Sequence, residues 1–201
     1  MRYLVIDTET GGLDPKKNAL LEIGARIFEE DGKICSGFHR KIMWDSSMST
    51  TVTIYALGLN KSSLIDGDSA PKVANDLAAW LACWSQERDI VLMGQNLQFD
   101  CDFLTAFMER YGFVNWMEPF RHRKIDTCHI ALFLQEVGLL PAYLKLGLAA
   151  LHKHFFGTDL PAAHTAMGDA ESTFAVYREM RRLMRERVSW DSTVAIGAKK
   201  P

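Results

Sequence analysis

The sequence has no excess of positive charge and no long hydrophobic run, and each absence excludes a class of protein. The formal net charge is -2 and the pI about 6.3, so no overall positive field attracts a polyanion. Such a partner would need local basic patches or metal ions. No apolar stretch approaches the roughly 20 residues needed to cross a bilayer. We therefore expect no membrane association.

Cysteine motifs, internal repeats and low-complexity segments are also missing. No Cys-x-x-Cys pair occurs and no signal peptide precedes the cysteines, so we expect buried thiols in a reducing cytosol and a cytoplasmic protein. The 201 residues are 48% hydrophobic and 24% charged, which predicts one compact domain with a real core. The four cysteines are Cys35, Cys83, Cys101 and Cys128.

The first dozen residues join an apolar run to two acids and two glycines. Leu4, Val5 and Ile6 are strand formers, and such a run closed by Gly-Gly predicts a buried central strand. Residues two apart in a strand share a face, so Asp7 and Glu9 project side by side, roughly 7 Å apart. Their charges repel unless a cation lies between them, and Mg²⁺ and Mn²⁺ prefer oxygen ligands. The pair is either half of a metal site or a strand end with two solvated acids.

The rest of the chain predicts an α/β fold, a mixed five-stranded sheet flanked by helices. A hairpin at Asp31-Gly32 joins strands at 19–28 and 33–40. Residues 43–71 predict a loop with short helical pieces. Apolar residues at helical spacing follow between 73 and 84. Further short strands are expected at 90–94 and near 124–127, with helices at 146–155 and from about 162 to 188.

Two acids lie inside the apolar arcs of predicted helices, where a carboxylate is unusual unless something pairs with it. Asp100 shares an arc with Phe103 and Phe107, whereas its neighbour Asp102 points outward. Asp169 occupies the same position at the start of the last helix. If both converge on the end of the first strand, four carboxylates would match two Mg²⁺ ions. A two-metal clamp suits in-line displacement at a phosphodiester.

Three motifs in this order resemble those of the DEDD exonucleases, in the subtype with histidine. They are Asp7-Thr8-Glu9-Thr10, the segment 96–100 that ends in Asp100, and His164-x-x-x-x-Asp169. That superfamily includes the proofreading epsilon subunits of bacterial replicative polymerases, RNase T and the TREX enzymes. The similarity spans about residues 3 to 187, with support from residues 20–24 and 125–127.

The resemblance implies a ribonuclease H-like fold and metal-dependent 3′-to-5′ exonuclease activity with two Mg²⁺ or Mn²⁺ ions. By position, Asp7 would bridge both metals, Glu9 and Asp169 would complete one, and Asp100 would serve the other, partly through water. His164 matches the general base, and an imidazole that titrates near neutrality suits that role. The products would be a nucleoside 5′-monophosphate and a shortened strand.

The same resemblance marks positions that would meet the terminal nucleotide. Simple turn, packing and capping roles remain open for them. For Asp126 we expect support of the fold rather than metal binding. The candidate substrate contacts are Thr8, Thr10, Gly11, Leu13, Asn96 and Phe99.

Other clusters give weaker signals. The spacing of Cys128, His129, His152 and His154 fits no usual zinc pattern. The basic run 121–124 is equally consistent with phosphate binding and with a solvated loop. For the arginines between 178 and 185 we favour a solvated helix face.

The leading hypothesis is an exonuclease that acts on the 3′ end of nucleic acid, with single-stranded DNA favoured over RNA and a DNA polymerase as a candidate partner. The alternatives are an RNA-trimming enzyme, an inactive relative that binds nucleic acid or a polymerase, and a hydrolase of free nucleotides or very short oligomers. We expect an exonuclease domain at 1–187 and a flexible tail at 188–201. The sequence leaves the oligomeric state open.

Overall fold

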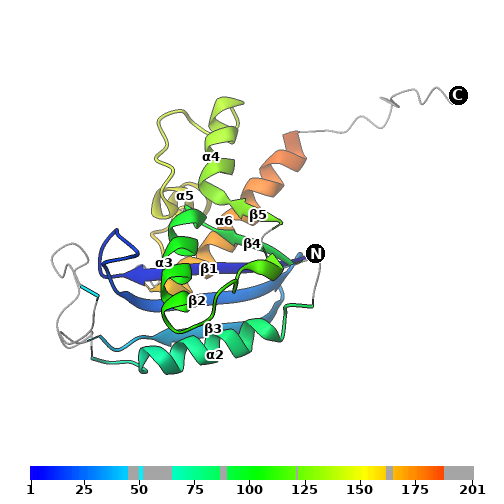
Figure 1. The fold of residues 1–201 in the computed structure, drawn as a ribbon. Helices are drawn as coiled ribbons and strands as arrows, with labels where there is room; N and C mark the ends of the chain where they lie inside the picture. The colour runs from blue at the N-terminus through cyan, green and yellow to red at the C-terminus, as the bar shows by residue number, and fades with distance from the viewer. Residues whose placement is uncertain (45–49, 52–64, 87–89, 121, 162–164, 188–201) are drawn as a thin grey trace, which may run out of the picture.

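A five-stranded mixed sheet forms the centre of the molecule (Figure 1). Its spatial order is β3-β2-β1-β4-β5; β2 pairs antiparallel with β1 and β3, and β4 runs parallel to β1 and β5. This confirms the predicted sheet. The strands are β1 (Arg2–Thr10), β2 (Leu20–Glu29), β3 (Ile34–Lys41), β4 (Ile90–Gly94) and β5 (Lys124–Asp126). The computed structural model describes residues 1–44, 50–51, 65–86, 90–120, 122–161 and 165–187.

Helices cover both faces of this sheet. Figure 1 shows α2 and α3 in front of the strands and α6 passing behind them, with α4 beyond β5 and α5 beside α6. The predicted order of strands and helices is confirmed, with ends that differ by a few residues. The helices are α2 (Ala70–Ala82), α3 (Leu97–Arg110), α4 (Thr127–Glu136), α5 (Leu148–Phe156) and α6 (Ala166–Arg187), with a 3-10 turn η2 (Glu118–Phe120).

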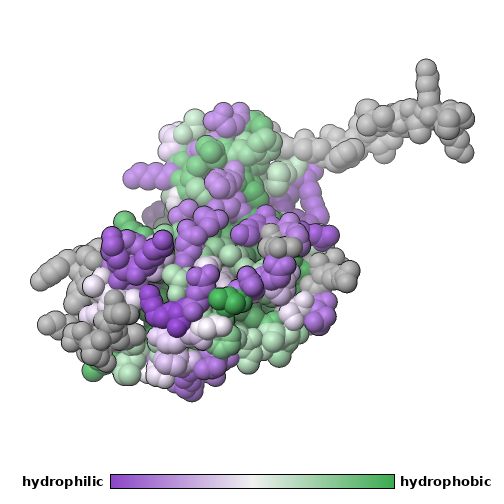
Figure 2. Space-filling view, viewed as in Figure 1, coloured by the Kyte–Doolittle hydropathy of each residue, from purple (hydrophilic) through white to green (hydrophobic). Residues whose placement is uncertain are grey.

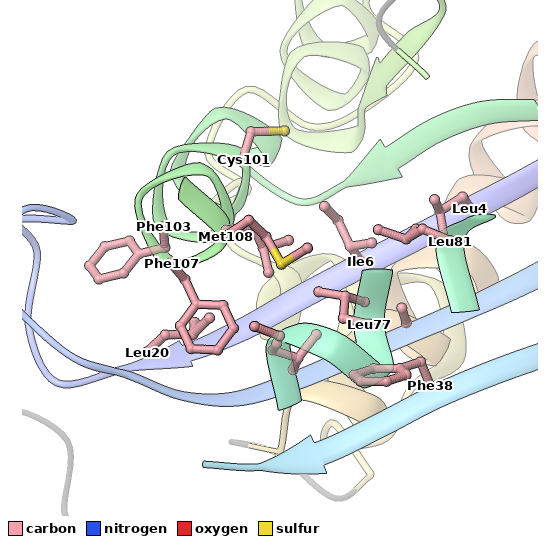
Figure 3. Close-up of a cluster of buried hydrophobic side chains, with 14 of the residues drawn as sticks. Leu4, Ile6, Leu20, Phe38, Leu77, Leu81, Cys101, Phe103, Phe107 and Met108 are labelled. Carbon is pink, nitrogen blue, oxygen red and sulfur yellow. The ribbon is translucent and has the colours of Figure 1, made fainter. Parts of the chain in front are cut away.

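Alternation along β1 divides its side chains between the two faces. Leu4 and Ile6 pack with residues of α2 and α3, as Figure 3 shows. Tyr3 and Val5 pack on the opposite face against Phe174 of α6. The central strand is therefore buried on both sides, which explains its continuous apolar run. The polar residues that follow must also alternate between an α3 side and an α6 side.

The predicted hairpin between β2 and β3 is confirmed. Gly32 donates its amide to the carbonyl of Glu29 at 3.0 Å and adopts a φ of +100°, which glycine reaches without steric cost. The loop expected at 43–71 lies largely outside the described residues. The tail expected at 188–201 does so entirely.

Apolar side chains gather on one part of the visible surface. Figure 2 shows them over α4, where Leu132 and Phe133 are exposed, while hydrophilic residues prevail around α3. Within the described residues, no helix combines the length and the apolar character that spanning a membrane requires.

Candidate active site

Asp7 and Glu9 lie on the α6 face of β1, at the carboxyl end of the strand. The register with β2 places Gly24 opposite Asp7 and Glu22 opposite Glu9. The pairing becomes irregular between Glu9 and Thr10, so the regular ladder ends just beyond the two acids. The predicted side-by-side arrangement is confirmed.

A third carboxylate reaches the same place from α6. Asp169 lies in the first turn of that helix, and one carboxylate oxygen from each of Asp7, Glu9 and Asp169 lies within 4.8 Å of the other two. Oxygens on opposite sides of a Mg²⁺ ion are separated by about 4.2 Å, twice the usual Mg–O distance. Small side-chain rotations would therefore suffice to close these acids around one ion. Two segments about 160 residues apart thus form one acidic site.

The electrostatics of the site favour a bound cation. Burial raises the pKa of Asp7 well above its ordinary value, and the charges of Asp100, Asp169 and Glu9 raise it further. A divalent ion would reverse this effect, because it stabilises the ionised carboxylates. Oxygen donors are also the ligands that Mg²⁺ and Mn²⁺ prefer. The residues present therefore fit a hard divalent cation.

Asp100, a residue of α3, lies against the opposite face of β1. Its side chain, 3% exposed, accepts a hydrogen bond from Thr8 Oγ1 at 2.7 Å, while Asp102 is exposed as predicted. Burial raises the pKa of Asp100 to about 7, and the hydrogen bond from Thr8 opposes that rise. Asp100 is close enough to raise the pKa of Asp7, but it is not part of the three-carboxylate group.

Asp126 supports the start of α3, as expected. Its carboxylate accepts backbone N–H bonds from Asn96 at 3.1 Å and Leu97 at 2.9 Å. The same side chain caps α4 by accepting from the amide of Cys128 at 2.9 Å. One carboxylate thus binds the free amide groups of two helices, and α3 is the helix that carries Asp100.

The six predicted substrate contacts fall into two groups. Thr8, Thr10 and Gly11 are buried and use polar groups within the fold: Thr10 Oγ1 donates to the Gly12 carbonyl at 2.7 Å, and the Gly11 amide donates to Ala19 at 2.7 Å. The other three offer surface to a ligand: Leu13 is 85% exposed, Asn96 is exposed, and Phe99 is half-buried against Phe103.

The remaining candidates from the sequence are His164, the Cys/His residues, the basic run 121–124 and the arginines of α6. His164 lies outside the described residues. Among the residues that are described, the carboxylates of Asp7, Glu9 and Asp169 are the group suited to a metal, and no Cys/His cluster joins them. The basic run is only partly described, since Arg121 lies outside. Three arginines of α6 pair with acids: Arg182 with Glu179 and Glu186, and Arg181 and Arg185 with Glu30, which favours a solvated face.

Sequence reasoning missed the role of Glu22. This residue is 7% exposed, and its Oε1 accepts the backbone N–H of Ala166, the first residue of α6, at 3.1 Å. The available signal was an acid within the apolar segment 20–23, which predicts a buried carboxylate that needs partners.

Comparison with known proteins identifies relatives over most of the chain. A family model described as "Exonuclease" (RNase_T) matches residues 4–177. A PolC-type DNA polymerase III from Staphylococcus haemolyticus is 28% identical over 184 residues, which cover 92% of this chain and 12% of that protein. The PolC-type enzyme of Streptococcus pyogenes is 31% identical over 172 residues, 85% of this chain and 10% of that protein. The chain thus spans only about a tenth of the length of these relatives.

Solved structures show the same fold at lower identity. E. coli exonuclease I in complex with a dT13 oligonucleotide matches with a TM-score of 0.72 at 14% identity, over 94% of this chain and 43% of that one. A zinc-bound complex of that enzyme with single-stranded DNA matches with a TM-score of 0.68 at 16% identity, over 93% and 41%. The ribonuclease H-like fold expected from the sequence is confirmed.

Proposed function

The chain belongs to the exonuclease family, and from this premise we propose that it removes nucleotides one at a time from the 3′ end of nucleic acid in a reaction that requires divalent cations. The products are nucleoside 5′-monophosphates. Single-stranded DNA is the proposed substrate, with RNA as the alternative that the experiment must separate.

The observation that carries this proposal is the meeting of Asp7, Glu9 and Asp169 within 4.8 Å. Such a concentration of carboxylates is costly in a fold unless cations occupy it. A phosphodiester is itself an anion and would be repelled by the acids alone. Cations between the acids and the phosphate resolve both problems, and this combination suits phosphodiester hydrolysis.

In the proposed arrangement, Asp7, Glu9 and Asp169 would hold one Mg²⁺ or Mn²⁺ ion, and Asp7 and Asp100 would hold a second. Bound there, such ions polarise the scissile phosphate and lower the pKa of a bound water. Asp7 and Glu9 are held in place by the β1–β2 ladder, and Asp169 by the first turn of α6.

His164 is the proposed general base. An imidazole is neutral in a large fraction of molecules near pH 7, so its free nitrogen can accept a proton from the attacking water. In the sequence, His164 lies two positions before Ala166, the first residue of α6, and Asp169 lies in the first turn of that helix.

The three predicted contacts with accessible side chains suggest how the terminal nucleotide is held. Leu13 and Phe99 offer apolar surface for a base or sugar, and Asn96 offers an amide. The support for DNA comes from relatives: two are DNA polymerases by name, and E. coli exonuclease I is described with DNA oligonucleotides. Association with a DNA polymerase is proposed on the same basis.

The test uses matched DNA and RNA oligonucleotides of one sequence. We expect a 3′-labelled DNA strand to release labelled mononucleotide at once in Mg²⁺, and a 5′-labelled strand to give a ladder of products each shorter by one residue. EDTA should stop both. Release from the 5′ end, metal-independent cleavage or an absence of turnover would contradict the proposal, and faster cleavage of RNA would favour the exoribonuclease alternative.

A further inference from the structure

Every second residue of β2 from Glu22 to Arg26 contacts the start of α6. These residues are Glu22, Gly24 and Arg26, and they lie on one face of the strand. Side chains two apart in a strand point the same way, so these positions form a single line across the sheet. The β1–β2 register sets this line beside the acids, with Glu22 opposite Glu9 and Gly24 opposite Asp7. Any element resting on this line is held next to the two carboxylates.

Glu22 binds the first amide of α6. Its Oε1 accepts the Ala166 N–H at 3.1 Å, across 144 residues of sequence. The same oxygen lies 2.8 Å from Nε2 of His39, which is the β3 residue paired with Gly24. The first amides of a helix have no partner within the helix, so an acid from another strand both satisfies one and fixes where the helix begins.

Gly24 and Arg26 hold the same turn by contact and by charge. A Cβ built at Gly24 would lie 2.2 Å from the carbonyl carbon of Ala166 and 2.3 Å from the nitrogen of Met167. The helix backbone therefore rests directly on the strand, where only glycine leaves room. Arg26 Nε donates to Glu171 Oε1 at 2.8 Å.

These contacts bracket Asp169. Two of them fall at residues 166 and 167 and the third at 171, so the turn that carries Asp169 is fixed on both sides. Glu22 does not belong to the carboxylate group that suits a metal. Its hydrogen bond to Ala166 acts on the helix, while its charge also raises the pKa of Asp7.

We propose that Glu22 is a positioning residue: through the Ala166 amide it sets the start of α6, so that Asp169 meets Asp7 and Glu9 at the spacing a divalent cation requires. The inference rests on the proposed metal-dependent nuclease function. Groups that orient metal ligands typically change metal affinity or activity by about 10- to 100-fold when removed.

The test compares Glu22→Ala with Glu22→Gln. Both remove the charge, but glutamine keeps an oxygen that can accept the Ala166 N–H. We expect Glu22→Ala to weaken Mn²⁺ binding about tenfold or more, measured by calorimetry without nucleic acid, and Glu22→Gln to stay within about threefold of wild type. The exonuclease kcat of Glu22→Ala should recover as Mn²⁺ is raised, with the KM for oligonucleotide little changed.

The matched control is Glu29→Ala, which removes the same charge at the other end of β2 and should bind Mn²⁺ as wild type does. Circular dichroism and thermal melting in EDTA establish that each variant is folded. If Glu22→Ala misfolds, Gly24→Ala provides the second route, since the added methyl group displaces the α6 backbone and should weaken Mn²⁺ binding in the same way.

The outcomes separate this inference from the function on which it rests. Wild-type protein that cleaves no oligonucleotide would overturn the proposed function itself. An active wild type together with a folded Glu22→Ala of normal Mn²⁺ affinity would overturn only the positioning role, as would equal losses in Glu22→Ala and Glu22→Gln, which would assign the effect to charge.

Discussion

Asp7 and Glu9, on the α6 face of β1, meet a third carboxylate, that of Asp169. On the α3 face, the carboxylate of Asp100 accepts a hydrogen bond from the hydroxyl of Thr8. The first face concentrates negative charge for cations to neutralise, whereas the second provides one buried acid with a donor from the protein. Changes to the three acids of the α6 face should therefore act mainly on activity, whereas changes to Thr8, the donor on the α3 face, should act more strongly on stability.

The largest effect is expected for Asp7→Asn. Loss of this ligand should lower kcat about a thousandfold or more, because metal-ion stabilisation contributes several kcal/mol to phosphodiester hydrolysis. Without metal, the variant should be as stable as wild type or slightly more stable, since one term of carboxylate repulsion is gone. Mononucleotide release and thermal melting in EDTA measure the two effects. Asp102→Asn, at an exposed position of α3, is the control, and a wild-type rate in Asp7→Asn would refute the assignment.

Metal binding gives the next largest effect. At a hundredfold excess over its dissociation constant, Mg²⁺ or Mn²⁺ should stabilise the fold by about 2.7 kcal/mol, a rise of roughly 5–10 °C in Tm for a domain of this size. Differential scanning calorimetry with and without the ion measures the shift. Most of it should vanish in Asp7→Asn but persist in Asp102→Asn. A Tm indifferent to both ions would show that the three acids do not form a metal site.

The α3 face can be tested through Thr8. Thr8→Val removes the donor but keeps the shape, and it leaves a buried carboxylate without that hydrogen bond. We expect a loss of about 2 kcal/mol in the free energy of unfolding at pH 8, measured by urea denaturation. Thr8→Ser retains the hydroxyl and should lose less. Equal stability of the two variants would mean that the Thr8–Asp100 bond contributes nothing.

Local patterns in the sequence predicted the elements that carry the site. The strand at 90–94 was confirmed at both ends, and helical periodicity placed Asp100 inward and Asp102 outward. The alternation of β1 placed Asp7 and Glu9 on one face. These features depend on residues a few positions apart, which is the range over which hydrophobic periodicity carries information.

Contacts between distant segments were beyond that range. The bonds from Thr8 to Asp100 and from Ala166 to Glu22 span 92 and 144 residues, and no periodicity reports which helix meets which strand. The sequence showed that Asp100 faces inward but not that Thr8 would be its donor. The resemblance places Thr8 among the substrate contacts, and the structure adds that its hydroxyl donates to Asp100.

The last prediction concerns pH. Burial raises the pKa of Asp100 to about 7 from its ordinary 3.8. An acid with a raised pKa binds more protons in the folded state, so stability is greatest below the unfolded-state pKa and falls as the pH rises towards the folded-state value. In EDTA we expect wild-type protein to lose up to about 1.4 kcal/mol per pH unit between pH 5 and 7 from this residue.

Asp100→Asn removes that contribution, because asparagine keeps an acceptor for Thr8 but does not titrate in this range. Its free energy of unfolding, from urea curves across the same pH values, should fall less steeply than that of wild type. The charge of Asp100 also raises the pKa of Asp7, so the flatter profile of the variant includes a smaller effect of Asp7 in the same direction. Parallel profiles would mean that Asp100 is ionised in the folded protein throughout, and the α3 face would then carry its charge as the α6 face does.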